Sequence, residues 1–444
     1  WTNGLWGDVK DGENMLAKIT DGGTFTNWGT NIGGKLGIDI TPVNGLKISA
    51  AVAPNFNNVK KKTFVKQIPY TRSEDPNTTV GYMGGYRTTN LTENRNDSHD
   101  ITTQFFANYA KTLGRHDFSV MIGYEDYYAF WENLDASRDQ YQLTSYPYLD
   151  LGSEDYRDNG GNAEEYAYRS LFGRMTYSYA DRYLIQANLR RDGSSRFGAD
   201  NQYGMFWAVG LGWNMERESF LQDVSWLTRL KVRGSVGTSG NNNIGDYAAQ
   251  GVYGYGSYNG ASTAYPARLP NPDLSWEKSM QASVGLDASL FDSRLNVTFD
   301  VYQRKTTDLL LSTRLSMTSG FSSRIDNVGE LMNKGYELSI SGDLIRTNDW
   351  KLTLNGMISQ NKNEIKKLYK GNDISVGWNN LIKEGYPINV YKMVRWAGVN
   401  PANGDALYYT ADGRITNTYN SNDAVVLDGK TPDPKYFGSF GANL

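Results

Sequence analysis

The chain has 444 residues, of which 39% are hydrophobic, and it is rich in Tyr (31 residues) and Gly (47 residues). A formal net charge of −3 gives no reason to expect a nucleic-acid partner, and the lack of Cys excludes disulfide bonds and thiolate metal sites. No stretch approaches the ~20 consecutive apolar residues of a membrane helix. Strands of a membrane barrel, however, conceal their hydrophobicity by alternation, so a membrane protein stays possible.

The first segment, residues 1–34, is rich in Gly, Asn and Asp and is predicted to be a loop region. The N-terminal sequence has no charged segment followed by an apolar one, so it does not resemble a signal peptide. The C-terminal segment 437–444 resembles the start of a strand that is not followed by a turn. We therefore expect the sequence to be a piece of a longer protein.

From residue 35 to residue 444, short segments alternate between apolar and polar residues, which is the pattern of a strand with one apolar face. The clearest example is 169–215, where Leu171, Met175 and Tyr177 share one face and Ser170, Arg174 and Thr176 share the other. Thirteen strands are predicted in this way, at 36–40, 46–52, 101–112, 117–131, 169–179, 183–190, 204–215, 230–237, 280–290, 295–301, 336–340, 350–358 and 437–444.

The connections between these strands alternate in length. Short turns are predicted at 43–45, 113–116, 180–182, 291–294 and 345–349, and the linker 216–229 is moderately long. Long loops are predicted at 55–100, 132–168, 238–273, 306–332 and 361–435, the last with a small hairpin about Asp412-Gly413. Alternating short and long connections are typical of outer-membrane barrels. The fold class is therefore all-β, as part of a large antiparallel transmembrane β-barrel with long extracellular loops.

Aromatic residues occur where the two interfacial girdles of such a barrel are expected. The residues assigned to girdles are Tyr177, Tyr179, Tyr183, Trp213 and Trp350 near short turns, and Trp131, Trp207 and Trp276 near long loops. Because bacterial single-chain barrels have an even number of strands, thirteen strands need further strands for closure.

Several short motifs recur in order between residues 192 and 438. The first is Asp192-Gly-Ser-Ser-Arg-Phe197, which follows the strand 183–190. The others are Leu230-Lys-Val-Arg-Gly-Ser-Val-Gly237, Gly240-Asn-Asn-Asn-Ile-Gly245, Asn271-Pro-Asp-Leu-Ser-Trp-Glu-Lys278, Asp300-Val-Tyr-Gln-Arg-Lys-Thr-Thr-Asp-Leu-Leu310, Asn327-Val-Gly-Glu-Leu-Met-Asn-Lys-Gly-Tyr-Glu-Leu338 and Pro432-Asp-Pro-Lys-Tyr-Phe-Gly438. Together these motifs resemble those of the SusC/RagA-type TonB-dependent transporters of the Bacteroidetes outer membrane.

This resemblance implies a barrel of about 22 strands with an N-terminal plug, a TonB box and a SusD-like surface lipoprotein as a lid. It also implies an outer-membrane importer of glycan or peptide nutrients that requires no cofactor and is not an enzyme. The plug, the TonB box and the final strands are not expected within these residues, so TonB would act through the missing N-terminal part. The alternatives are a passive porin, an outer-membrane barrel enzyme or a secreted β-rich adhesin.

Charged residues on the polar strand faces are interpreted as the solvated interior of the barrel, packed against the missing plug, with a substrate track as the alternative. They are Arg174, Arg190, Lys231, Arg233, Asp287, Asp300, Arg304, Glu337, Asp343 and Lys351. Aromatic residues in the long loops are candidates for substrate binding, although packing on one another or on the lid protein is the favoured interpretation. These residues are Tyr253, Tyr255, Tyr258 and Trp378.

No motif supports a metal or catalytic site. Asp155, Asp158, Asn159 and Glu164 form an oxygen-rich segment, interpreted as a loop, but their spacing does not follow the regular calcium-loop pattern. A Ser-His-acid site would need a well-placed His, and we assign His99 to a loop and His116 to a short turn. Neither a metal site nor a catalytic residue is therefore predicted.

Overall fold

The computed structural model describes residues 5–7, 14–72, 74–75 and 77–444. The chain comprises two compact units. The first consists of residues 1–38, 49–105 and 125–168, and the second of residues 39–48, 106–124 and 169–444.

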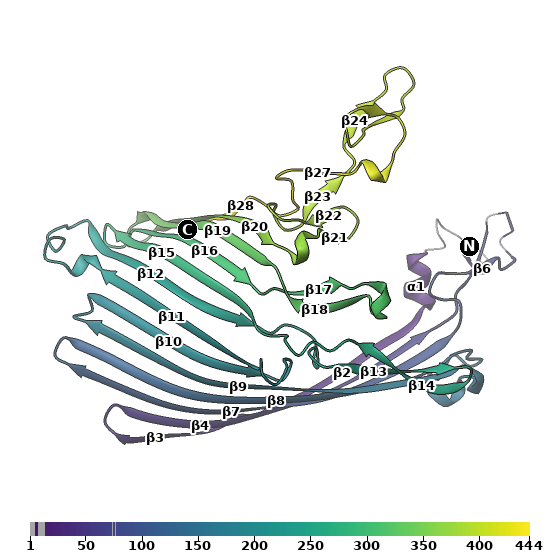
Figure 1. Ribbon diagram of the computed structural model, residues 1–444, viewed down its shortest axis with the longest axis horizontal. Coiled ribbons are helices and arrows are strands. Elements are labelled where there is room, and N and C mark those ends of the chain that lie inside the picture. Colours follow the sequence, from purple (N-terminus) through teal and green to yellow (C-terminus); the bar gives the residue numbers. More distant parts are fainter. Residues whose placement is uncertain (1–4, 8–13, 73, 76) are drawn as a thin grey trace. The chain divides into compact units, whose positions relative to one another are not determined.

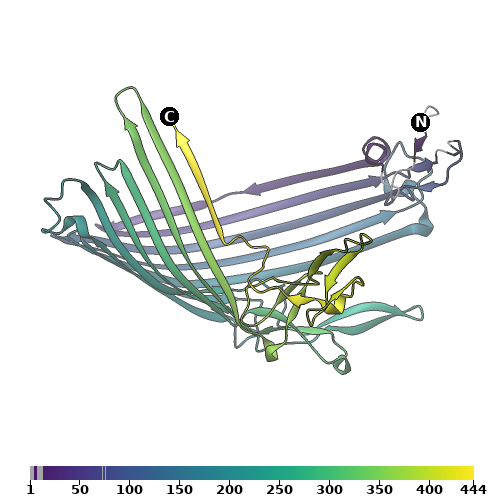
Figure 2. The same cartoon turned by 90° about the horizontal axis from the view of Figure 1, so that it is seen from above.

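Fourteen strands of the described residues form one large sheet. The pairs β2–β4, β10–β11, β11–β12, β12–β15, β15–β16, β16–β19, β19–β20 and β20–β28 are all antiparallel. Most strands that follow one another in the chain are neighbours in the sheet, and the last strand, β28, pairs with β20 (Figure 2). The strands are β2 (Gly23–Gly33), β3 (Leu36–Val43), β4 (Leu46–Val65), β7 (Asn90–Leu113), β8 (His116–Arg138), β9 (Arg157–Tyr179), β10 (Tyr183–Ser194), β11 (Tyr203–Asn214), β12 (Leu227–Asn241), β15 (Glu277–Leu290), β16 (Leu295–Thr307), β19 (Glu330–Arg346), β20 (Lys351–Lys367) and β28 (Tyr436–Asn443).

The thirteen predicted strands are confirmed, but the predicted loop 1–34 is wrong for much of its length. It contains helix α1 (Met15–Asp21), where the Asn14 side chain caps the helix by accepting a hydrogen bond from the Ala17 backbone, and strand β2. Residues 1–4 and 8–13 of the predicted loop lie outside the described residues. No helix within the described part of the chain has the length and apolar character needed to cross a membrane.

The predicted loops 55–100 and 132–168 are also partly wrong. Strands β4 and β8 run on to Val65 and Arg138, and β7 and β9 already begin at Asn90 and Arg157. These extensions are mostly polar, and their few apolar residues, such as Phe64 and Leu91, do not alternate regularly with polar ones. Their strand conformation comes from backbone hydrogen bonds to neighbouring strands, which any side chain permits.

In the second unit, alternation sorts the side chains onto an apolar face and a polar face. Ala187, Val209 and Val236 lie in register on β10, β11 and β12, and Val284 faces Val301 across β15 and β16. These strands run side by side in Figure 1. Val284 is 62% exposed although it is apolar, and the sheet therefore presents an uncovered apolar surface.

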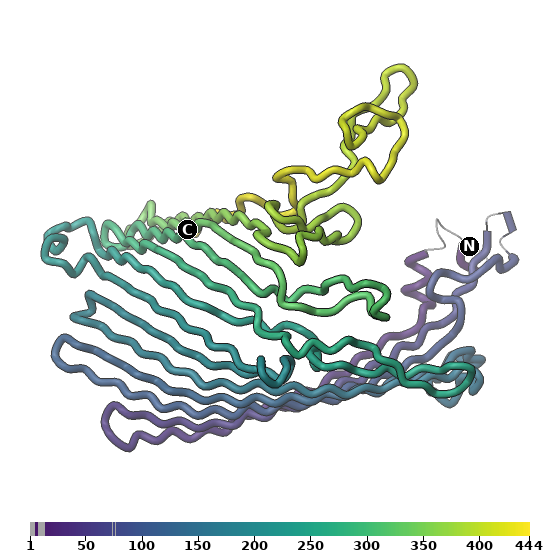
Figure 3. Tube along the Cα trace, viewed as in Figure 1, coloured from purple at the N-terminus to yellow at the C-terminus, as the bar shows by residue number. Residues whose placement is uncertain are grey.

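The long connections of the second unit carry small sheets of their own. The prediction of a hairpin about Asp412-Gly413 is confirmed by the pairing of β25 (Ala406–Tyr409) with β26 (Ile415–Thr416), within a segment drawn in yellow-green in Figure 3. The small strands here are β13 (Val252–Tyr258), β14 (Ala261–Arg268), β17 (Leu310–Arg314), β18 (Ser323–Asn327), β21 (Ile374–Val376), β22 (Asn380–Ile382), β23 (Val390–Met393), β24 (Trp396–Val399), β25 (Ala406–Tyr409), β26 (Ile415–Thr416) and β27 (Val425–Val426).

The first unit has its own small apolar clusters. Ala17 of α1 packs with Ile68 and Met83, beside a sheet of β1 (Trp6–Gly7), β5 (Pro69–Thr71) and β6 (Gly81–Tyr82). A second cluster joins Phe64 to Leu91 and Tyr141. The first cluster lies outside the large sheet, whereas the second joins the end of β4 and the start of β7 to Tyr141 in the connection after β8.

The prediction that Trp276 belongs to an interfacial girdle of exposed aromatic residues is wrong. Its side chain is only 4% exposed, packs against Phe197 and Phe206, and donates from Nε1 to the Gln202 carbonyl at 2.9 Å. Near the short turns, by contrast, Tyr183 stacks on Trp213 with ring centroids 6.5 Å apart. Stacked, partly exposed Tyr and Trp rings are the arrangement expected at a membrane interface.

Candidate functional site

A cavity of about 420 Å³ on the polar face is the best-defined candidate site. All of its lining side chains come from the polar faces of five neighbouring strands, β12, β15, β16, β19 and β20. We call it the wall cavity, and its lining residues are Arg233, Gln281, Ser283, Asp300, Tyr302, Arg304, Asn333, Glu337 and Asn361.

An ion pair that crosses a whole strand forms one side of the wall cavity. Arg233 on β12, Gly285 on β15 and Asp300 on β16 lie in register, and the Arg233 side chain extends over the glycine to reach Asp300 at 2.7 Å. A Cβ atom at Gly285 would lie 2.5 Å from Asp300 Oδ1 and 2.6 Å from Arg233 Cζ. Arg233 also donates to Asp287 at 3.0 Å, so one guanidinium bridges two carboxylates.

A second contact of the same form lies beside it. Tyr302 crosses Gly335 and donates to Asn361 Oδ1 at 3.2 Å, and Asn361 donates to Asn333 Oδ1 at 3.3 Å. A Cβ atom at Gly335 would lie 2.6 Å from the Tyr302 hydroxyl and 2.3 Å from the Gln360 carbonyl oxygen. Glycines on the polar face thus leave space for side chains that link alternate strands.

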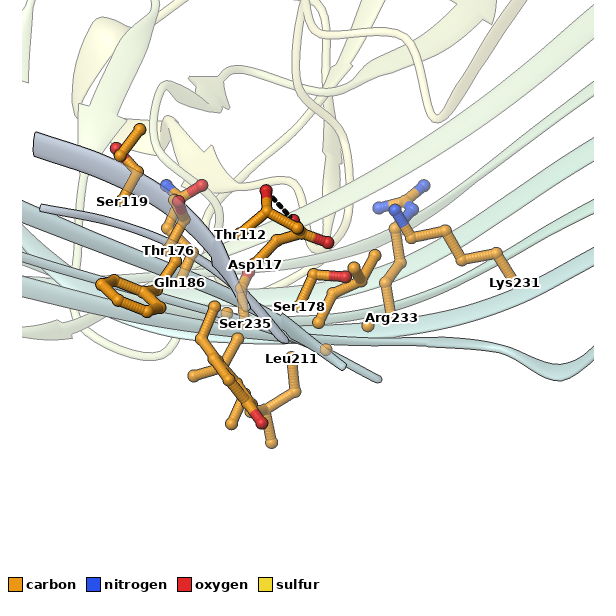
Figure 4. Close-up of a pocket in the computed structure, with 18 of the residues that line it drawn as sticks. Thr112, Asp117, Ser119, Thr176, Ser178, Gln186, Leu211, Lys231, Arg233 and Ser235 are labelled. Carbon is orange, nitrogen blue, oxygen red and sulfur yellow. Dashed lines mark hydrogen bonds between the residues drawn. The ribbon is translucent and has the colours of Figure 1, made fainter. Parts of the chain in front are cut away.

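A larger cavity of about 610 Å³ lies against β7 to β12 and β15. Figure 4 shows Lys231 and Arg233 on the same side of the strands as Thr112, which donates to Asp117 at 2.5 Å, whereas Leu211 lies on the other side. Because residues of both faces line it, this cavity is an open depression of the sheet. The wall cavity is the better candidate for specific binding.

Most of the ten charged residues predicted on the polar face have partners within the sheet. Arg174 donates to Asn188 at 3.0 Å, and the ion pairs include Arg190 with Asp192 at 2.5 Å and Lys351 with Asp343 at 3.5 Å. Together with Arg233, Asp287 and Asp300, they agree with the interpretation of a polar interior that is largely self-neutralised.

The motifs that carry the family resemblance converge in one place, which we call the motif cluster. Phe197 packs against Trp276 with ring centroids 5.3 Å apart, and Arg196 pairs with Asp246 at 2.7 Å. Asn327 holds the motif Asn271–Lys278 in place through two hydrogen bonds. Its side chain accepts from the Ser275 backbone N–H at 2.7 Å and donates to the Ser275 carbonyl at 2.7 Å. The motif cluster is therefore a structural anchor for the loop-side ends of the strands.

A buried carboxylate organises the turn between β11 and β12. Glu218 accepts from the Tyr183 hydroxyl at 2.7 Å, from Trp213 Nε1 at 2.9 Å and from Arg182 at 3.0 Å. The hydrogen bonds from Tyr183 and then Trp213 lower the pKa of Glu218, burial opposes them, and Arg182 lowers it further. Glu218 thus ties the interfacial aromatic residues to the turn as an anion.

The loop aromatics proposed from the sequence do not form a single platform. Tyr253 and Tyr255 share one face of β13, Tyr258 projects from the other, and Trp378 lies on a separate connection between β21 and β22. Their exposures range from 68% to 97%, and among the described residues none of them packs on another aromatic ring. All four are accessible to a ligand or a partner.

The oxygen-rich segment is not a loop, which corrects the prediction. Asp155 lies in a 3₁₀ turn (Glu154–Tyr156), whereas Asp158, Asn159 and Glu164 lie on β9, whose alternation spreads side chains over both faces. Among the described residues no three His, Cys, Asp or Glu side chains form a cluster suited to a metal ion.

The two histidines lie on strands. His99 belongs to β7, not to a loop as predicted, and its ring lies 5.5 Å from the ring of Phe130. His116 begins β8 beside its short turn and shares a hydrogen bond of 2.8 Å with the Tyr177 hydroxyl. Each imidazole therefore contacts aromatic side chains.

Comparison with known proteins identifies the architecture. Residues 4–441 match the model of the family described as TonB dependent receptor-like, beta-barrel. TonB-dependent receptor P39 of Formosa agariphila is 32% identical over 395 residues, which cover 88% of this chain and 36% of that protein. TonB-dependent receptor SusC of Bacteroides thetaiotaomicron is 34% identical over 321 residues, which cover 67% of this chain and 32% of that protein.

A solved structure agrees with the sequence relatives. The structure of the RagAB peptide transporter superposes with a TM-score of 0.84 at 28% identity, covering 94% of this chain and 46% of that one. The chain thus spans about a third to a half of the length of the proteins it matches. Its apolar face meets lipid and its polar face lines the interior. The chain belongs to the TonB dependent receptor-like β-barrel family, of the SusC/RagA type, and forms part of an outer-membrane barrel.

Proposed function

We propose that this chain is the barrel portion of a TonB-dependent importer that brings glycan or peptide nutrients across the outer membrane. The observation that carries the proposal is the similarity over 94% of the chain to a structure described as a peptide transporter, together with the SusC relative. The polar face supports it, because a wall cavity and a self-neutralised interior suit the passage of polar solutes.

The proposed partners are TonB, acting through the part of the protein outside this sequence, and a SusD-like lipoprotein on the extracellular side. The proposed contacts for nutrient or lipoprotein are Tyr253, Tyr255, Tyr258 and Trp378. They are exposed on connections at the loop side, where a captured ligand would first arrive. A transport role needs no catalytic residue or cofactor, and none is assigned.

The test is uptake by cells in which the complete gene is deleted and then restored. Fluorescently labelled oligopeptides and oligosaccharides are supplied as alternative cargoes, with and without TonB. We expect uptake of one class to require both this protein and TonB, because energy-coupled import depends on TonB. Uptake that persists without TonB would instead identify a passive porin and overturn the proposal.

A further inference from the structure

On the face of β4 that meets lipid, an apolar series of side chains gives way to a polar one. The apolar series occupies alternate positions from Leu46 to Phe56, and the same face continues with Asn58 and Lys60. A tilted strand crosses the hydrocarbon with about 9–11 residues, which the stretch from Leu46 to Phe56 supplies. Ile32 of β2, in register with Phe56, is likewise apolar and exposed. The hydrocarbon region therefore ends near Phe56, on the side of the long connections.

A layer of aromatic rings marks the same level on the neighbouring strands. The ring of His99 on β7 lies 6.2 Å from the ring of Phe56 and 5.5 Å from the ring of Phe130 on β8. Aromatic side chains gather where the hydrocarbon meets the headgroups of the lipid. Lys60 lies four residues beyond Phe56, about 13 Å along the strand, and is in register with the exposed Trp28 of β2. Both side chains are therefore placed at the level of the headgroups.

A groove of about 420 Å³ opens on this outward face, and we call it the outer groove. It is lined by Trp28 and Thr30 of β2 and by Asn58 and Lys60 of β4. Trp28 faces Lys60 and Thr30 faces Asn58 in the strand register, so all four side chains project from the same face. The ammonium group suits a phosphate, the hydroxyl and amide groups suit sugar hydroxyls, and the indole ring offers an apolar surface with a polar edge.

The two carboxylates beside the outer groove are held by neighbouring donors. Glu93 of β7 pairs with Lys62 at 3.1 Å and with Arg95 at 2.9 Å. Asp97 accepts a hydrogen bond of 3.0 Å from the amide of the groove. The charge that lines the outer groove itself is the exposed ammonium group of Lys60, so the groove favours an anion.

We propose that the outer groove binds the phosphorylated-sugar headgroup of a lipid in the outer leaflet of the outer membrane. Lys60 contacts the phosphate, Trp28 packs against the sugar ring, and the acyl chains of the same molecule lie along the apolar surface that ends at Phe56. The order of these groups along the strands, apolar, then aromatic, then cationic, matches a lipid, whereas a soluble anion would leave the apolar surface without a role. A plug in the interior would leave this site open, because the face points away from the interior.

The test measures the affinity of the complete protein in detergent for diphosphorylated lipid A and for the same lipid with both phosphates removed, by microscale thermophoresis. We expect the phosphorylated lipid to bind about five-fold more tightly, which is the effect of one Lys at a membrane surface, and the preference to shrink as salt rises. Lys60→Gln should abolish the preference and Lys60→Arg should keep it. Trp28→Ala should weaken the binding of both lipids by a similar factor, because both retain the sugar ring.

Lys61→Gln is the matched control, because it removes the same charge one residue away, on the inward face of β4, and should leave both affinities unchanged. Heat-modifiability on gels confirms that each variant is folded. Equal affinity for the two lipids, or an equal loss in Lys60→Gln and Lys61→Gln, would overturn the proposal. Inorganic phosphate in large excess should fail to displace the lipid, and complete displacement would identify a site for free phosphate instead of a lipid site.

Discussion

Arg233 and Asp300 form an ion pair of 2.7 Å although a whole strand separates them. The pair exists because Gly285, in register between them, leaves the polar face of β15 open. The register of three strands, rather than proximity in sequence, creates this contact.

Replacing Gly285 by Ala should therefore break the Arg233–Asp300 pair. The added methyl group would lie 2.5 Å from Asp300 Oδ1, and overpacking of this kind costs about 1–3 kcal/mol. We expect a lower urea midpoint for unfolding of the complete protein in detergent. Gly234→Ala on neighbouring β12, where the nearest atom would be 3.8 Å away, should leave that midpoint almost unchanged.

Replacing Val284 by Arg should impair insertion of the protein into the membrane. Val284 lies on the apolar face in the middle of β15, and Arg near the centre of a barrel wall costs about 2–4 kcal/mol. The measurement is the fraction of protein recovered as the heat-modifiable form from outer membranes. Thr298→Arg, on the polar face of the adjacent strand, is the control, and an equal loss for both variants would argue against a lipid-facing Val284.

The stability contributed by Glu218 should depend on pH. Its hydrogen bonds lower its pKa below the ordinary value of 4.5, so its contribution is present above pH 4.5 and is lost as pH falls through the lowered pKa. We expect Glu218→Gln to be less stable than the natural protein at pH 7, with the difference narrowing in acid. Asp223→Asn, an exposed change in the same linker, should show no such narrowing in the same urea titrations.

Trp276→Ala should be among the most destabilising single changes. The side chain is 4% exposed and fills the centre of the motif cluster, and removing a buried Trp costs about 3–5 kcal/mol. Thermal unfolding followed by Trp fluorescence or gel shift provides the measurement. Retention of the natural unfolding temperature would show that the motif cluster is not an anchor.

Trp378→Ala should leave the stability of the protein almost unchanged, in contrast to Trp276→Ala. The side chain is 97% exposed, so its removal should change stability by no more than about 0.5 kcal/mol. If this residue contacts nutrient or lipoprotein, the affinity for one of them should fall in calorimetric titrations. Full retention of both affinities would remove Trp378 from the proposed contact set.

The thirteen predicted strands were found because a surface facing lipid on one side and water on the other imposes strict alternation, as in Met205, Trp207 and Val209. Strand β2 was missed because its sequence, rich in Gly, Thr and Asn, has no such alternation. Where most residues are polar, as along β4 from Asn57 to Thr63, sequence periodicity disappears while the backbone ladder continues.

The sequence by itself determined the class of fold, the rhythm of short and long connections and the family, because each depends on local pattern or short motifs. Tertiary structure alone decided which residues meet. Trp276 looked like an interfacial residue and lies buried against Phe197, and Arg304 and Glu337 share the wall cavity through the pairing of β16 with β19. Strand register brings together residues distant in the chain, and register is set by the cooperative pairing of whole strands rather than by any one segment.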